Sequence, residues 1–171
     1  MMFILMSLMT QLASATGVTA QNWMSHPEIT QIRLLRKQIE DDGKHPAWTV
    51  KKEDMAQCAG QTLSKRAVLL DPQGTIRRYK AQGTENGVSF STTQYYNKEG
   101  RLRFVHLRLT HDEQQASTEY TTFLDVHGSR LFEHVQRTTD DGAVLPGELP
   151  ERHLVLRPKK SWAKTNPCGT R

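Results

Sequence analysis

The sequence of 171 residues lacks the short motifs that usually identify an enzyme. It contains no glycine-rich phosphate loop, no dinucleotide-binding fingerprint, no Cys-x-x-Cys pair and no Gly-x-Ser-x-Gly elbow around a serine nucleophile. No two histidines have the H-x-x-x-H spacing of a helical zinc site. These absences predict no metal and no cofactor, and they favour a non-enzymatic role over catalysis.

Long apolar runs are also missing. The first twenty residues contain only a short apolar run. Residues 1–20 contain no charged side chain, and the short apolar run Phe3–Met9 gives way to small residues over Ala13–Ala20. This order is typical of a secretory signal peptide, with cleavage expected after Ala20. A membrane anchor is the alternative, but a spanning helix needs about 20 apolar residues. We therefore expect export to the periplasm or the extracellular space.

Cysteine is scarce, with only Cys58 and Cys168. In an exported chain an even pair is most simply a disulfide, which would close a long loop and hold the C-terminal tail. The alternatives are two buried free thiols, or a thiol nucleophile at Cys58. We favour the disulfide because it accounts for both cysteines.

The charge is moderately basic, with 23 Lys and Arg against 18 Asp and Glu, a formal net charge of +5. Such a balance favours loose attraction to an anionic envelope component or to a protein partner. Nucleic acid is not expected, because the basic runs Arg77–Lys80 and Arg101–Arg103 fall in predicted strands. Alternate side chains of a strand point to opposite sides, which divides each run between two faces.

The first element after the leader is a predicted amphipathic helix over residues 26–42. Ser25 and Glu28 fit a capping box, apolar residues such as Ile29 and Ile39 fall on one face, and Gly43 ends the helix. Residues 52–57 are predicted to form one or two helical turns.

Residues 63–137 have the composition of strands and carry three similar turns. An apolar or aromatic pair leads into Asp or Asn, two variable residues and Gly in blocks 69–74, 95–100 and 123–128. Each block fits a hairpin turn in which the Asp or Asn bonds its own backbone and Gly takes a left-handed conformation. The sequence therefore predicts an antiparallel β-meander of three hairpins. In the second hairpin Gln94 is expected opposite Phe104, and in the third Phe123 opposite Leu131.

The segment Tyr96–Leu102 resembles the turn of the YD-type β repeats of large bacterial surface and toxin proteins. This resemblance covers seven residues, with looser copies at the other two turns. It implies hairpins and carries no activity with it.

The predicted fold is thus α+β, a single domain over residues 21–171 in which the N-terminal amphipathic helix packs on the three-hairpin meander. Residues 152–157 are expected to form one last short strand, and residues 158–171 a basic C-terminal tail.

Candidate site residues are few. Tyr96, His106, Tyr120 and His134 could line a polar ligand-binding pocket if the sheet curls. A loop cluster of His106 and His111 with residues 112–113 was considered for a metal, but solvated loop side chains account for it better. No catalytic residue is assigned. The leading hypothesis is a small exported binding or interaction module, and the alternative is an exported hydrolase or small-ligand-binding protein that uses the pocket.

The cysteine hypothesis gives a direct test. Protein purified from a secreting host should contain no titratable thiol before reduction and two thiols after it, because Cys58 and Cys168 form a disulfide. Two titratable thiols in the native, oxidised protein would contradict the bond.

Overall fold

The structure, a computed structural model, describes residues 17–54, 61–111, 116–138 and 147–164, without the side chains of 61–64. Its elements in chain order are α1 (Pro27–Asp42), β1 (Thr49–Asp54), β2 (Gln61–Leu70), β3 (Ile76–Glu85), β4 (Val88–Tyr96), β5 (Leu102–His111), β6 (Ala116–Leu124), β7 (Arg130–Thr138), the 3-10 helix η2 (Glu151–His153) and α2 (Pro158–Ala163). Both Cys58 and Cys168 lie outside the described residues, so the disulfide stays a prediction.

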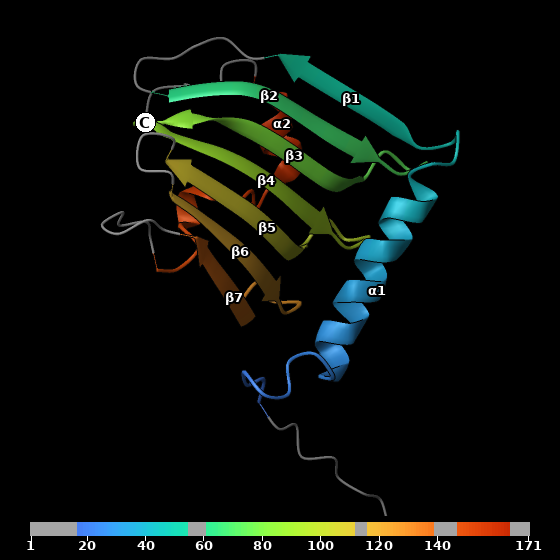
Figure 1. The fold of residues 1–171 in the computed structure, drawn as a ribbon. Helices are drawn as coiled ribbons and strands as arrows, with labels where there is room; N and C mark the ends of the chain where they lie inside the picture. The colour runs from blue at the N-terminus through green and yellow to red at the C-terminus, as the bar shows by residue number, and fades with distance from the viewer. Residues whose placement is uncertain (1–16, 55–60, 112–115, 139–146, 165–171) are drawn as a thin grey trace, which may run out of the picture.

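The strands form one seven-stranded sheet in the order β1 to β7, and every neighbouring pair is antiparallel. The expected α+β class with an antiparallel sheet is confirmed. Figure 1 shows α1 beside the strand ends where the chain turns from β2 to β3 and from β4 to β5, with α2 on the far side of the sheet.

Two local predictions are wrong. Residues 52–54, expected in a helical turn, belong to edge strand β1, because this segment pairs in regular register with β2 from Thr49↔Leu70 to Asp54↔Lys65. The strand expected over residues 152–157 is instead the end of η2 followed by an irregular stretch. The N–H of Leu154 bonds back to Glu151 rather than across to a strand. The first part of the expected basic tail, Pro158–Ala163, is helix α2.

The three expected turns are present and nearly identical. Gly74, Gly100 and Gly128 have φ of +75°, +76° and +91°, in the left-handed region. In the middle turn, the Asn97 side-chain Oδ1 accepts a hydrogen bond from the N–H of Arg101 at 2.8 Å. The carboxylates of Asp71 and Asp125 accept the equivalent bonds from Thr75 and Ser129, each at 2.8 Å. Each turn is therefore fixed by its own side chain.

A bulge follows each turn and changes the register that we expected. Tyr96 pairs with Leu102 but Tyr95 pairs with Phe104, so Arg103 is the extra residue and Gln94 lies opposite Val105. The third hairpin has the same irregularity. There Phe123 pairs with Phe132 rather than with Leu131. Both expected pairings are wrong by one residue, because a bulge places two residues of one strand opposite one of the other.

The bulge arginines connect one hairpin to the next. Nε of Arg77, in the bulge of the first hairpin, donates to the carbonyl of Tyr96 at 3.1 Å. Nε of Arg103, in the second bulge, donates to the carbonyl of Leu124 at 3.0 Å. Tyr96 and Leu124 each immediately precede the turn of the following hairpin. These bonds align the three turns at one end of the sheet.

Helix α1 packs on the sheet through one apolar stripe. Ile29, Ile32 and Ile39 are at most 1% exposed and join a cluster with Phe104 and Phe123. The helix begins at Pro27 with His26 as its N-cap, and no side chain caps it. The expected capping box from Ser25 is wrong, since the hydroxyl of that residue donates to the carbonyl of Asn22 at 3.1 Å.

The opposite face of the sheet is covered by residues 147–164, which we call the strap. The buried side chain of Gln94 bonds the backbone of the strap, as a neighbouring strand would otherwise do. Its Nε2 donates to the carbonyl of His153 at 2.6 Å, and its Oε1 accepts from the N–H of Val155 at 2.9 Å. The Tyr96 hydroxyl donates to the carbonyl of Val155 at 2.9 Å. The strap thus satisfies its backbone groups with side chains of β4.

Arg66 of β2 fixes the other end of the strap. Its guanidinium donates to the carbonyls of Ser161, Trp162 and Lys164 at 2.9, 3.0 and 2.9 Å. It also lies over the Trp162 ring, 4.6 Å from the centroid, and its Nε donates to Glu53 of β1 at 2.8 Å. A cation at the last carbonyls of a helix is favourable, so Arg66 stabilises the end of α2.

The turn geometry predicts a graded loss of stability at Gly100. A Cβ there meets nothing within 4 Å, so its only cost is the positive φ. Gly100→Ala should lower the free energy of unfolding by about 1 kcal/mol, and Gly100→Val by more, because a β-branched side chain tolerates this region least. Equilibrium urea denaturation measures both. The neighbouring exposed Lys98→Ala is the control and should change stability by less than about 0.5 kcal/mol. Unchanged stability in both Gly100 variants would contradict a strained turn.

The strap geometry predicts a second, larger effect. Gln94→Leu removes both partners of the strap backbone and leaves a buried carbonyl and a buried N–H unsatisfied, at a cost of about 2 kcal/mol or more. Hydrogen exchange across residues 147–164 should also accelerate. The matched control is Gln136→Leu on β7, where the glutamine is exposed. Equal losses in the two variants, with unchanged exchange in the strap, would show that Gln94 does not hold it.

Candidate functional site

The face of the sheet that carries α1 is only half covered by it. Side chains that pair across the strands and point to this face form successive rows. The row nearest the turns is Val50, Leu69, Arg78, Tyr95, Phe104, Phe123 and Phe132. This first row lies under α1, because Leu69, Tyr95, Phe104 and Phe123 share one buried cluster with the helix isoleucines.

A polar contact marks the edge of the covered half. Glu40 of α1 accepts from Nη1 of Arg78 and from the hydroxyl of Tyr95, at 2.6 Å each. Burial alone would raise the pKa of Glu40, but the bonds from Tyr95 and Arg78 hold that pKa below its usual range. Burial and the adjacent carboxylate raise the pKa of Tyr95. Glu40 is therefore ionised and engaged at neutral pH.

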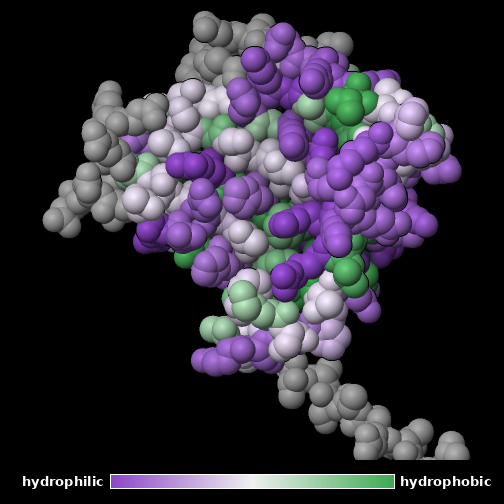
Figure 2. Space-filling view, turned by 45° about the vertical axis from the view of Figure 1, so that its right-hand side comes forward, coloured by the Kyte–Doolittle hydropathy of each residue, from purple (hydrophilic) through white to green (hydrophobic). Residues whose placement is uncertain are grey.

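Beyond α1 the same face is polar and exposed, and we call its next two rows the open half-face. The second row is Lys52, Ala67, Lys80, Thr93, His106, Thr121 and His134, and the third is Asp54, Lys65, Gln82, Ser91, Arg108, Glu119 and Gln136. Figure 2 shows hydrophilic residues over most of the surface on this side, with hydrophobic ones in small separate patches.

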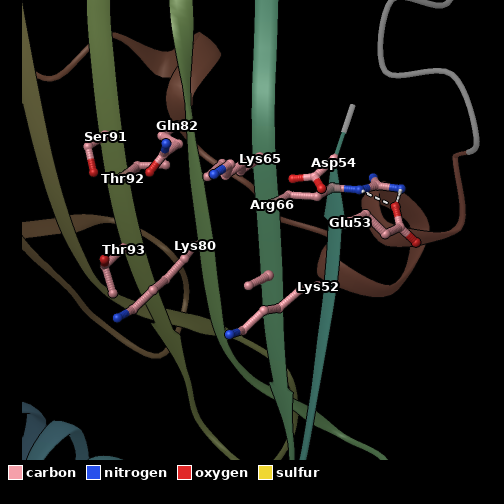
Figure 3. Close-up of a pocket in the computed structure, with 12 residues that line it drawn as sticks. Lys52, Glu53, Asp54, Lys65, Arg66, Lys80, Gln82, Ser91, Thr92 and Thr93 are labelled. Carbon is pink, nitrogen blue, oxygen red and sulfur yellow. Dashed lines mark hydrogen bonds and ion pairs between the residues drawn. The ribbon is translucent and has the colours of Figure 1, made fainter. Parts of the chain in front are cut away.

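A shallow hollow of about 560 Å³ lies in the open half-face, over β1 to β4. Ala67 is part of its lining and pairs with Lys52 on one side and Lys80 on the other. Because neighbouring strands are about 4.8 Å apart, a short side chain between two long ones leaves a depression. Figure 3 shows the ammonium groups of Lys52 and Lys80 at one end of the hollow with Thr93, and Lys65 near Gln82 at the other.

The hollow lysines differ from the arginines of the sheet in having no carboxylate partner. Strand arginines are paired with carboxylates within 4.0 Å: Arg66, Arg77, Arg78, Arg103, Arg108 and Arg130 bind Glu53, Asp71, Glu40, Glu28, Glu119 and Glu133. Within the part of the chain that the structure describes, Lys52, Lys65 and Lys80 form no such pair. Asp54 lies opposite Lys65 in the register, yet no ion pair joins them. The hollow therefore carries more positive than negative charge, although Lys80 also interacts electrostatically with Glu40.

The four residues expected to line a ligand pocket are not brought together. His106 and His134 lie on the open half-face, where His106 Nε2 is 3.7 Å from Glu119 and the ring of His134 stacks on Trp23. Tyr96 and Tyr120 are fully buried on the strap side. Burial raises the pKa of both tyrosines, which keeps them neutral. The sheet itself separates the two histidines from the two tyrosines.

The described residues offer no other obvious chemical centre. No group of three or more His, Cys, Asp or Glu side chains among them could hold a metal ion. Of the loop cluster considered above, His106 and His111 are in β5, while residues 112–113 lie outside the described ranges. On the strap side, burial and then the nearby Arg152 lower the pKa of His153, and Glu85 opposes them. This keeps His153 neutral next to the bonds that hold the strap.

Sequence reasoning missed the hollow for a specific reason. Residues 52–57 were expected to be helical, which removed Lys52 from the sheet. The signal that could have found the site is alternation, because Lys65 and Ala67 are two apart on β2, as are Lys80 and Gln82 on β3. Each pair therefore shares a face. Which strand neighbours which, however, follows only from the register.

Comparisons with protein-family models, with curated proteins and with solved structures find no match to this chain. None of the helices in the described ranges is both long enough and apolar enough to cross a membrane.

Proposed function

We propose that this chain is an exported binding module that engages an anionic partner, such as a component of the cell envelope, through the open half-face. Export rests on the leader-like composition of residues 1–20. The N-terminal helix and the hairpin meander would form the rigid frame, and the predicted Cys58–Cys168 disulfide would tie the C-terminal tail to it.

One observation carries the proposal: half of one sheet face is uncovered, polar and richer in cations than in carboxylates. Lys52, Lys65, Lys80 and Arg108 are all exposed there, against Asp54 and Glu119. What sets this face apart is the clustering of its cations, because clustered charge of one sign raises the rate and strength of encounter with the opposite sign.

The alternative, an exported hydrolase or small-ligand-binding protein, has less support. It requires Tyr96, His106, Tyr120 and His134 to converge on one ligand, but two of these side chains are buried on the strap side and the others are on the helix side. The open hollow suits a partner that approaches a surface better than a substrate that must be enclosed.

The proposal is tested by moving charge off the open half-face. A variant with Lys52, Lys65, Lys80 and Arg108 all changed to Gln should bind vesicles of anionic phospholipid, or an anionic polysaccharide, at least tenfold more weakly than the unchanged protein. Binding of the unchanged protein should weaken with added salt, since exposed charges are screened. Affinity is measured by cosedimentation or interferometry at several salt concentrations.

The control changes the same net charge elsewhere. Lys37, Lys51, Lys98 and Lys159 are exposed and lie on α1, on the strap side of β1, in a turn and on α2. Changing these four to Gln should reduce affinity by less than about threefold, from long-range charge alone. An unchanged protein that binds no anionic probe at low salt, or equal losses in the two variants, would refute recognition by this face.

A further inference from the structure

The three lysines of the hollow are placed so that their charges can converge on one point. Lys52 and Lys80 flank Ala67 in the register, which puts their backbones about 10 Å apart across two strand spacings. Lys65 is two residues from Ala67 on the same strand and points to the same face. Each side chain is long enough to bring its ammonium group over Ala67.

The chemistry of these donors favours a phosphate over a carboxylate. Lysine acts as a point charge toward phosphate, whereas planar carboxylates are best bound by the guanidinium fork of arginine. The arginines closest to the hollow are already engaged, Arg78 by Glu40 and Arg66 by Glu53. The lining also offers the hydroxyls of Ser91 and Thr93, which can donate to further oxygens of a tetrahedral group.

The charge of the hollow also matches a dianion. Besides Arg66 and Glu53, which pair with each other, the lining holds three lysines and one carboxylate, Asp54, which pairs with none of them in the described structure. A phosphomonoester carries about −1.5 to −2 charges at neutral pH, with a second pKa near 6. A sulfate ester carries a single charge and would leave the hollow partly uncompensated.

We propose that the hollow over Ala67 binds a phosphate dianion, held by Lys52, Lys65 and Lys80. This rests on the proposed function and names the group that the open half-face recognises. The phosphate is either free in solution or the terminal phosphomonoester of a larger molecule, such as a lipid headgroup.

Titration of the full-length mature protein with sodium phosphate at constant ionic strength tests the site, followed by amide and lysine NMR shifts or calorimetry. Lys52→Gln, Lys65→Gln and Lys80→Gln should each weaken binding about fivefold, because one charge about 4 Å away contributes about that much in water. Lys51→Gln, next to Lys52 but on the strap side of β1, should change the affinity by less than twofold.

A second pair of variants tests the shape of the hollow without changing its charge. Ala67→Leu fills the floor and should weaken phosphate binding at least fivefold, whereas Ala67→Ser keeps a small side chain and should leave the affinity within twofold. Urea denaturation of each variant checks that it is folded. If Ala67→Leu does not fold, the lysine variants alone test the site.

The pH dependence identifies the dianion. Binding of phosphate should fall as the pH drops from 7.5 to 5, because inorganic phosphate gains a proton at about pH 7 and a phosphomonoester at about pH 6. Sulfate stays a dianion over this pH range, so its binding should not show this loss.

Vesicles separate the two sources of phosphate. A preference for phosphatidic acid, a phosphomonoester, over phosphatidylglycerol that is lost in Lys52→Gln and Lys80→Gln would assign the site to a membrane headgroup. Phosphate binding with the same variant pattern but no such preference would assign it to free phosphate.

Absence of phosphate binding, or equal affinities of Lys51→Gln and Lys52→Gln, would overturn the inference. The function proposed above would still stand if the four-cation variant of the open half-face loses binding to anionic probes while the control variant keeps it.

Discussion

The hydrogen bond from each turn Asp or Asn to its own backbone is the constraint on which the architecture depends. It fixes the conformation of residues 71–75, 97–101 and 125–129, and a bulge follows each of these turns. In the first two hairpins the bulge presents an arginine that bonds the carbonyl just before the next turn. Local chemistry within about six residues thus aligns hairpins through bonds between residues 19 and 21 apart in sequence. The first row of the helix-side face follows from this alignment, and so does the position of α1.

The open half-face exists because helix α1 is too narrow to cover the full length of the strands. A helix with its side chains is about 10 Å wide, whereas a strand of nine or ten residues extends for about 30 Å. Because α1 lies across the turn ends of the strands, it can cover only the rows nearest those turns. Its contact with Arg78 through Glu40 marks the limit of that cover. The residues of the open half-face are polar because they contact water. Serine and threonine would be polar enough for that contact. The three lysines around Ala67 add a cluster of positive charge that polarity alone does not require.

The sequence predicts a structural feature well when the interacting residues are close together in the chain, and poorly when they are far apart. The three turns are predictable because Asp71, Asn97 and Asp125 act on their own neighbours, and helix α1 is predictable from its isoleucine spacing. The register is not, because a bulge residue such as Arg103 looks like any other strand residue until its partner is known. The strap is missed for the same reason: the side chain of Gln94 substitutes for a strand partner about 60 residues away. The hollow depends on Lys52. This residue lies in a run of charged side chains that does not look like a strand in the sequence, although it forms edge strand β1.

The edge strand β1 belongs to both faces of the molecule at once. Lys52 points into the hollow, and the next residue, Glu53, points the other way and binds the arginine that caps helix α2. One peptide unit thus separates the helix-side surface from the anchor of the strap. Because the two residues are adjacent on one strand, the position of β1 sets both the approach of Lys52 to the hollow and the contact of Glu53 with Arg66.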